Sequence, residues 1–249
     1  PIETCRTSSW QSILRCSISL VAVLALVLAL PGAARAQAYQ CRAPVVAAVP
    51  RIAPDGPRRV LPVSGYTLAL SWSPEFCRTR TKARAHHLQC SGAAGRFGLV
   101  VHGLWPQSQR GWPQWCPARA APSPAELRGA LCLMPSPDLV ARQWAKHGAC
   151  MTRRPGQYLK VIRILWEGLS LPDYDRIARE EGLTAGRIRA AFATANPGWP
   201  ASAIVVRLGP RGWLEEIRLC YGKTFRPAPC PPARRGGGDE APARIWRGL

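Results

Sequence analysis

The cysteines of this chain constrain its fold more than any other feature. The sequence of 249 residues contains ten cysteines, and the first two, Cys5 and Cys16, lie in an N-terminal segment that includes a long apolar stretch. The remaining eight run from Cys41 to Cys230. An even number of cysteines is typical of an exported protein whose thiols are oxidised, so we expect four disulfides. A zinc site is the alternative, but no Cys-x-x-Cys occurs and no histidine lies at ligand spacing from a cysteine pair.

The N-terminal segment is typical of a signal peptide. Arg6 and Arg15 precede an uncharged run over residues 16–30, which ends at Pro31 and is followed by the small-residue pattern Ala34-Arg35-Ala36. We therefore predict a signal peptide over residues 1–36 and a secreted or periplasmic protein. A transmembrane anchor is the alternative, although the run of 15 uncharged residues is shorter than the roughly 20 residues that a spanning helix needs.

Composition divides the rest of the chain into three parts. Residues 37–62 are rich in Ala, Pro and Arg without a sustained period, which predicts an extended leader, and residues 63–231 carry the patterns of one folded domain. Residues 232–249 have few apolar side chains, which predicts a flexible basic tail. The net charge of +20 favours a polyanionic partner such as nucleic acid, anionic polysaccharide or a membrane surface. Arginine used for solubility would give the same charge, so charge alone does not select the partner.

Hydrophobic periodicity predicts the strands and helices of the folded domain. Ser123 and Ser136 each precede a proline and an acidic residue, which predicts two helix starts, and the second helix is expected to run to Gly148. A nearly continuous apolar run predicts a buried strand that delivers His102 at its end. The expected strands are 65–72, 96–101, 203–208 and 213–221, the last two joined by a four-residue hairpin connection. Further helices are expected from residue 157, over 172–181 and after Thr184.

Two short segments are distinctive because each delivers a histidine that is followed by glycine. The chain has four histidines, and these two are His102, after a predicted strand, and His147, at the end of a predicted helix. Lys146 immediately precedes the second of them. On that helix Arg142 shares a face with Lys146, and Gln143 shares another with His147, because each pair is four residues apart. Two histidines and a lysine suit proton transfer around an anionic group.

These segments resemble the two active-site motifs of the ribonuclease T2 family. The matching residues are His102-Gly103-Leu104-Trp105-Pro106 and Lys146-His147-Gly148-Ala149-Cys150. Three further stretches resemble the family's first core strand, its approach to the second motif and its last strand with the closing disulfide: 68–77, 134–137 and 214–231. The resemblance therefore covers about residues 65–231, in the family's order. It implies an α+β fold with a central, mainly antiparallel sheet, helices packed on it and disulfides that staple it.

The resemblance also implies the activity of a secreted, metal-independent endoribonuclease without a cofactor. His147 would take the proton of the ribose 2′-OH, His102 would protonate the leaving 5′-oxygen, and Lys146 would stabilise the phosphorane. The products would be a 2′,3′-cyclic phosphate and then a 3′-phosphate. The expected partner is single-stranded RNA and not DNA, which lacks the 2′-OH. We expect a monomer without stable membrane association.

Three more residues are expected to bind substrate through the same resemblance. Trp105 stands where the family stacks a base, although a core Trp in a turn is the alternative. Gln107 stands where some members use Asp to bind a purine, and its amide both donates and accepts, which predicts a loose base preference. Arg142 replaces the His that commonly begins the second motif, and it is either a phosphate contact or an outward-facing surface residue.

Gln143 replaces a Glu of the second motif and removes a carboxylate from the expected catalytic set, although some bacterial members also have Gln. Neither this change nor Arg142 removes the acid or the base, so we expect a slower enzyme rather than an inactive one. Two alternatives remain open. One is a binding protein of the same fold with impaired catalysis. The other is a zinc-dependent phosphodiesterase whose ligands are the four histidines, His86, His87, His102 and His147.

The family pattern implies three of the four disulfides. These are Cys77–Cys90, Cys116–Cys150 and Cys220–Cys230, and they leave Cys41 and Cys132 to each other. A bond between Cys116 and Cys150 would pin the helix end that bears Lys146 and His147 to the loop beyond His102.

Overall fold

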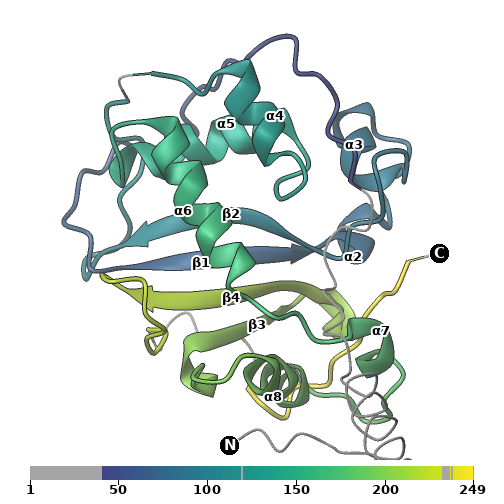
Figure 1. Ribbon diagram of the computed structural model, residues 1–249. Helices are drawn as coiled ribbons and strands as arrows, with labels where there is room; N and C mark the ends of the chain where they lie inside the picture. Colours follow the sequence, from purple (N-terminus) through teal and green to yellow (C-terminus); the bar gives the residue numbers. More distant parts are fainter. Residues whose placement is uncertain (1–40, 119, 232–235, 237, 249) are drawn as a thin grey trace, which may run out of the picture. The chain divides into compact units, whose positions relative to one another are not determined.

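The computed structural model describes residues 41–118, 120–231, 236 and 238–248, and these described residues belong to one compact unit. The predicted signal peptide lies outside the described residues. Within the described part, strands pair into a single antiparallel sheet with the strand order β2-β1-β4-β3. The strands are β1 (Gly65–Trp72), β2 (Leu99–Gln107), β3 (Ile204–Leu208) and β4 (Leu214–Gly222). Together with the helices in Figure 1, this sheet confirms the α+β fold.

Most of the predicted helices form near their expected bounds because their start signals are local. Ser123 makes a full capping box with Glu126 at the start of α4, and the Ser136 side chain accepts a hydrogen bond from the Leu139 amide at the start of α5. Thr184 caps α8 in the same way. The helices are α2 (Ser73–Cys77), α3 (His87–Cys90), α4 (Pro124–Ala130), α5 (Pro137–Lys146), α6 (Pro155–Glu167), α7 (Tyr174–Ile177) and α8 (Ala185–Ala195).

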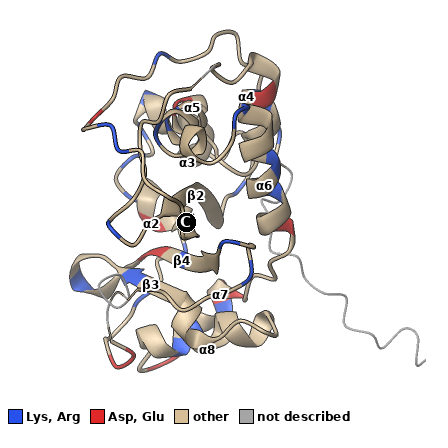
Figure 2. Cartoon of the chain, turned by 90° about the vertical axis from the view of Figure 1, so that its left-hand side faces the viewer, with Lys and Arg blue, Asp and Glu red and all other residues tan. Residues whose placement is uncertain are grey.

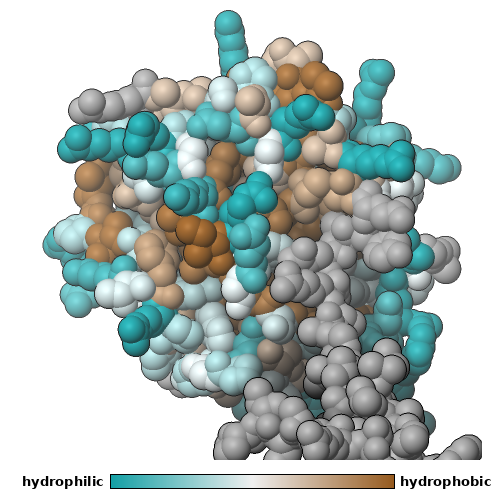
Figure 3. Space-filling view, in the orientation of Figure 1, coloured by the Kyte–Doolittle hydropathy of each residue, from teal (hydrophilic) through white to brown (hydrophobic). Residues whose placement is uncertain are grey.

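One face of the sheet is apolar and the other carries polar groups. Leu68 and Leu70 of β1 are fully buried in the core together with Ile217 and Leu219 of β4. The core also contains side chains of α4, α5, α6, α7 and α8, so the helices pack on this face. Figure 1 shows α5 and α6 beside β2 and α8 beside β3. In the same orientation, Figure 3 shows apolar residues grouped near the middle of this side with hydrophilic residues around them.

The opposite face, which we call the polar face, is defined by the alternate residues of the strands. Its members include Thr67, Ser71, Trp105, Glu216 and Arg218. The cross-strand register places Ser71 opposite Glu216, and Thr67 opposite Trp105. Side chains of successive residues point to opposite faces of a sheet, so these residues share the side away from Leu68 and Leu70.

The strand that carries His102 is longer than predicted. The predicted strand ends before His102, whereas β2 runs on to Gln107 and pairs with β1 along its whole length. The register shifts between Ala69 and Leu70, because Ala69 pairs with Gly103 while Leu70 pairs with Val101. His102 is therefore the extra residue of a β-bulge, a feature that re-aims a side chain. Glycine and proline after His102 suggested a turn, but cross-strand pairing outweighs these local signals.

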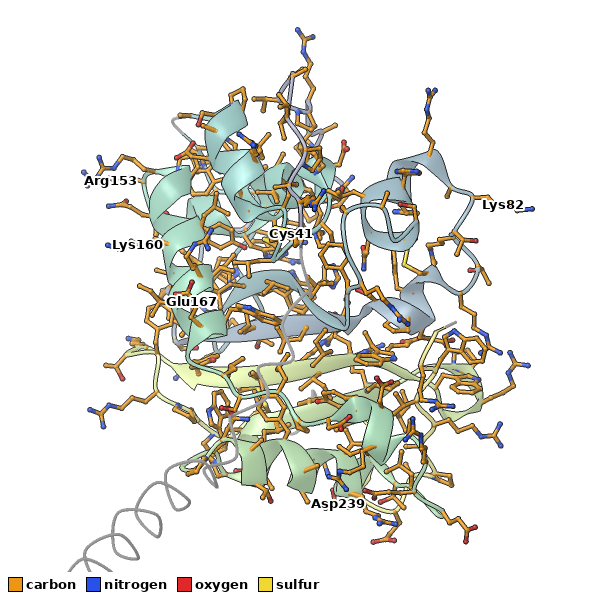
Figure 4. The ribbon with its side chains drawn as sticks, turned by 45° about the vertical axis from the view of Figure 1, so that its right-hand side comes forward. Cys41, Lys82, Arg153, Lys160, Glu167 and Asp239 are labelled. Carbon is orange, nitrogen blue, oxygen red and sulfur yellow. A yellow bond between two sulfur atoms is a disulfide. The ribbon has the colours of Figure 1, made fainter. Side chains whose placement is uncertain are left out.

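All four expected disulfides are present. They join Cys41 to Cys132, Cys77 to Cys90, Cys116 to Cys150 and Cys220 to Cys230. Cys41 is labelled in Figure 4, and its disulfide to Cys132 joins the leader to the segment after α4. Leader residues Val46, Val49 and Ile52 pack against the core. The described part of the leader, residues 41–62, is therefore docked on the domain.

The C-terminal segment over residues 238–248 packs on the domain. Ala243 and Ile245 are buried in the core, and the indole of Trp72 donates a hydrogen bond to the carbonyl of Trp246 at 2.6 Å. The Leu214 amide donates to the carbonyl of Arg244 at 2.8 Å. This packing differs from the flexible tail expected from composition. The segment has too few apolar residues to fold alone, but two of them complete the core beside β4 and α8.

Candidate active site

His102 projects from the bulge of β2 and is held by a carboxylate. Its Nδ1 lies 2.8 Å from Oε1 of Glu216, and its side chain is 40% exposed while that of Glu216 is 7% exposed. Burial acts to raise the pKa of Glu216, but the hydrogen bond to His102 and the charge of Arg218 outweigh it, so the pKa lies below its ordinary value. With Nδ1 bonded to an ionised carboxylate, Nε2 is the ring nitrogen left to exchange a proton with a substrate.

Glu216 and Arg218 were missed by the sequence analysis. Both lie on the polar face of β4, where Nε of Arg218 donates to Oε2 of Glu216. The alternation of β4 contains a signal for them, because Ile217 and Leu219 face the core. The neighbouring Glu215 is exposed.

His147 reaches the site from the C-terminal end of α5 and is buried. Its exposed fraction is 7%. Burial lowers the pKa of His147 to about 3, with further lowering by the charges of Lys146 and His102, while Asp55 and the Pro113 carbonyl act in the opposite direction. Nδ1 is buried without a hydrogen-bond partner among the described residues. The ring is therefore neutral near pH 7 and able to accept a proton.

Trp105 lies between the two histidines. Its ring centroid is 5.3 Å from that of His102 and 5.9 Å from that of His147. Its indole Nε1 donates a hydrogen bond to Oε1 of Gln143 at 2.8 Å. A Cβ at Gly103 would overlap both partners of this bond, so glycine is required there. Trp105 belongs to β2 and is partly exposed, not a core residue in a turn.

Gln143 is therefore placed behind the site rather than in it. Its exposed fraction is 5%, and it lines neither of the two cavities described below. The Gln amide orients Trp105 through the bond from the indole. A carboxylate at this position would accept the same bond, but it would also bring a charge into a buried place.

Arg142 and Lys146 converge on a carboxylate of the leader, Asp55. The Lys146 Nζ lies 2.8 Å from Oδ1 of Asp55, and Nη1 of Arg142 lies 2.8 Å from Oδ2. The hydrogen bond from Lys146, together with the charges of both cations, holds the pKa of Asp55 below its usual value, although burial acts to raise it. Nothing in the sequence pointed to Asp55, because the leader lacks the periodicity that would place it.

The site opens into a pocket of about 300 Å³. Four of the predicted site residues line it, namely Trp105, Gln107, Lys146 and His147, together with Thr67, Trp112, Val205, Arg218 and Cys220. Gln107 donates from Nε2 to the Trp105 carbonyl at 3.2 Å, while its Oε1 is buried without a partner among the described residues. A ligand donor in the pocket would satisfy this oxygen.

His102 and Arg142 line a second cavity of about 760 Å³, which lies over the polar face and the α2–α3 region. Arg218 lines both cavities. Of the other histidines, His86 packs edge-on against Phe76 at 5.0 Å. The described residues contain no group of three or more His, Cys, Asp or Glu side chains able to hold a metal ion. None of the helices in the described part is long and apolar enough to cross a membrane.

The chain is similar in sequence to proteins named ribonucleases. No family model matches the chain. A protein named ribonuclease from Aeromonas hydrophila is 35% identical over 176 residues, which cover 64% of this chain and 71% of that protein.

Solved structures share the fold at low identity. The RNase-related protein from Calystegia sepium has a TM-score of 0.55 and 20% identity, over 71% of this chain and 95% of that one. The structure of RNase NT in complex with 5′-AMP has a TM-score of 0.52 and 20% identity, over 74% of this chain and 98% of that one.

Proposed function

The chain belongs to the ribonuclease T2 family, and we propose that it cleaves single-stranded RNA by acid–base transesterification without a metal ion. The observation that carries the proposal is the difference between the two histidines around Trp105. One is bonded to a carboxylate, and the other is buried beside a lysine. Cleavage requires one group that accepts a proton and one that donates a proton in the same site.

His147 acts as the general base. Its low pKa keeps the imidazole neutral near pH 7. The neutral ring can then accept the proton of the ribose 2′-OH. A base with so low a pKa is weak in the free protein. The approach of a negatively charged phosphate favours the protonated ring, which raises its basicity as the reaction proceeds.

His102 acts as the general acid. In the imidazolium form Nδ1–H donates to Glu216, and Nε2–H gives its proton to the departing 5′-oxygen, which leaves a neutral ring still bonded to Glu216. The roles of the two histidines reverse when water opens the 2′,3′-cyclic phosphate to a 3′-phosphate.

Lys146 and Arg142 supply the positive charge that the phosphorane needs. Lys146 lines the pocket beside His147, and Arg142 lines the adjoining cavity beside His102. Asp55 holds the two side chains next to each other. A fixed cation near a developing negative charge stabilises the transition state more than the ground state.

Trp105 and Gln107 form the base-binding part of the pocket. The Trp ring offers a face for stacking, and the unpaired Oε1 of Gln107 accepts from a base amino or imino group. RNase NT, which shares the fold, has been solved in complex with 5′-AMP, which supports a nucleotide as ligand here. The four disulfides support an exported protein, secreted or periplasmic. The proposed protein acts as a monomer, and DNA is not cleaved because it lacks the 2′-OH.

An RNA-binding protein with impaired catalysis is the second candidate function, and Arg142-Gln143 is the reason for considering it. Gln143 replaces a carboxylate, but it bonds to Trp105 and lines neither cavity. The proposed acid and base are both retained. We therefore favour the enzyme.

Digestion of total RNA in excess EDTA tests the proposal. We expect fragments with 2′,3′-cyclic phosphate ends at early times and 3′-phosphate ends later, and no cleavage of single-stranded DNA. The His102→Ala variant is the matched control, because its side chain is partly exposed and its loss leaves the core intact. Binding of RNA without any cyclic ends would favour the binding protein. Activity that EDTA abolishes would favour the zinc enzyme.

A further inference from the structure

The larger cavity continues from the candidate active site across the polar face. Its volume is about 760 Å³, compared with about 300 Å³ for the pocket beside Trp105. His102 is one of its lining residues, so a chain bound at His102 can extend into it. We call this cavity the arginine groove, after the six arginines among its lining residues: Arg78, Arg80, Arg142, Arg207, Arg211 and Arg218.

Two arginines of the arginine groove, at the β3–β4 hairpin, have no acidic partner among the described residues. Four acidic residues also line it: Glu75, Asp138, Glu215 and Glu216. Glu216 is already bonded to His102 and Arg218, and Glu75 lies 3.5 Å from Arg78. The side chains of Arg207 and Arg211 are exposed, and neither makes a hydrogen bond or ion pair with another described residue. Two free guanidinium groups thus lie along the groove beyond His102.

The hairpin fixes the positions of these two arginines. Arg207 pairs with Glu216 across β3 and β4, so it extends from the polar face beside the carboxylate that holds His102. Arg211 adopts a left-handed conformation with φ of 63°, which is unfavourable for a residue with a side chain. The turn is nevertheless held, because the Gly212 carbonyl accepts from the amide of Arg244 at 2.8 Å. The docked C-terminal segment therefore helps to set the groove.

Two other arginines of the groove, Arg78 and Arg80, lie against aromatic rings. The Arg78 guanidinium lies 4.7 Å from the ring of Trp213 and 4.5 Å from that of Trp246, and Arg80 lies 4.5 Å from the ring of Phe76. A guanidinium that stacks on a ring keeps N–H donors at its edge for a phosphate. It also loses less side-chain freedom on binding than a mobile lysine would.

We propose that the arginine groove binds phosphates of the RNA that flank the scissile bond, so that the protein prefers RNA chains of several nucleotides to dinucleotides. This proposal rests on the ribonuclease function proposed above. Each guanidinium matches two phosphate oxygens, and such contacts release counterions, which makes affinity depend on salt. Figure 2 shows Lys and Arg on many loops and helices of the side that it views, so net charge alone would not give this selectivity.

The test is an Arg207→Gln/Arg211→Gln double variant, assayed on two substrates. On a decaribonucleotide we expect kcat/KM to fall about tenfold, mainly through KM, and the slope of log KM against log salt to fall by roughly 1.4, or 0.7 for each lost phosphate contact. On a dinucleoside monophosphate, which has one phosphodiester, we expect kcat/KM within about twofold of the parent, because phosphate contacts away from the reacting bond are not used.

An Arg153→Gln/Lys160→Gln double variant is the control, since it removes the same charge. Both side chains extend away from the body in Figure 4 and line neither the pocket nor the groove. Equal losses in the two double variants, or an equal loss on both substrates, would overturn the proposal.

Binding of a 2′-O-methyl decanucleotide, which lacks the nucleophile, separates this proposal from the ribonuclease function. We expect the Arg207→Gln/Arg211→Gln variant to bind it about tenfold more weakly at low salt, whatever its activity. Parental affinity would overturn the groove even if the protein cleaves RNA. Weaker binding would support the groove even if the protein cleaves nothing.

Discussion

The two histidines of the site reach it from opposite kinds of local structure. His102 is the extra residue of a strand bulge, is partly exposed and is bonded to Glu216. His147 ends a helix, is buried, and has no hydrogen-bond partner at Nδ1 among the described residues. The Glu216 carboxylate fixes Nδ1 of His102 and leaves Nε2 facing the site, whereas burial beside Lys146 favours the neutral ring of His147. Two identical side chains thus acquire the different surroundings that an acid and a base require.

Replacement of either histidine is expected to have the largest effect on activity. His102→Ala and His147→Ala should each lower kcat/KM on RNA by about 10²–10⁴-fold, because each removes one partner of the proton transfers. Their effects on stability should differ. His147→Ala opens a buried cavity and should cost about 1–3 kcal/mol of unfolding free energy. His102→Ala removes one hydrogen bond from Glu216, which keeps its bond to Arg218, and should cost about 0.5–1 kcal/mol. Urea unfolding and RNA cleavage measure both, and a larger loss of stability for His102→Ala would contradict the comparison.

Glu216→Gln is expected to have the next largest effect on activity, and to act through His102 and not through His147. The variant keeps the shape of the side chain but removes the charge that holds the ring and its proton, so kcat should fall by roughly tenfold or more. KM should change little, because Glu216 acts through His102 and does not itself contact the substrate. Glu215→Gln is the control, since this neighbour is exposed and has no bond to His102. An equal fall in kcat for Glu215→Gln would show that Glu216 does not act through His102.

The disulfide at the end of α5 should affect His147 more than His102. Cys116–Cys150 closes 34 residues, and the Trp115 amide beside it donates to the Lys146 carbonyl at 2.8 Å. Changing both cysteines to Ser should cost about 3–4 kcal/mol of stability and lower kcat several-fold at temperatures where the variant is folded. The Cys77–Cys90 pair is the control. Its removal should cost about 3 kcal/mol without changing kcat, and equal effects on kcat would remove the catalytic role of Cys116–Cys150.

Local signals explain which parts of this comparison were predictable from sequence. The helix that ends at His147 begins with a serine cap and proline, and these residues act within one turn. The strand β1 alternates cleanly, so its apolar face was correct. Three disulfide pairs came from the family pattern and the fourth followed by elimination, and all four are present.

The features that were missed depend on contacts distant in sequence. The bulge at His102 exists because residues after it pair with Gly65–Ala69, against the local turn signal of Gly103 and Pro106. The alternation of β4 places Glu216 on the polar face, but its bond to His102 joins residues 114 apart in the sequence, which no local pattern shows. The burial of His147 depends on the loop around Trp115, and Asp55 comes from a leader without periodicity.

The buried histidine should also make stability depend on pH. In the folded protein the pKa of His147 is about 3, compared with 6.5 for an unperturbed histidine, so between these values the unfolded chain binds a proton that the folded one does not. Stability from this residue is full above about pH 6.5 and is lost as the pH falls toward 3. The Tm of His147→Gln should therefore fall less between pH 7 and pH 4 than that of the parent. His87→Gln, at an exposed position, should follow the parent, and parental behaviour of His147→Gln would show that His147 is not buried as a neutral ring.

Asp55→Asn should have the smallest effect on activity. It should act through Lys146, Arg142 and His147 and not through His102. Asp55 bonds to Lys146 and Arg142 and acts to raise the pKa of His147, so its loss releases the two cations and lowers that pKa further. We expect kcat to fall about two- to fivefold, because Lys146 and Arg142 would stay near the phosphate but would no longer be held in place. The acidic limb of the pH–rate profile should move to lower pH and the alkaline limb should stay. Asp55→Glu, which keeps the charge, should restore part of kcat. A faster Asp55→Asn variant would mean that Asp55 competes with the substrate phosphate for these cations rather than positioning them.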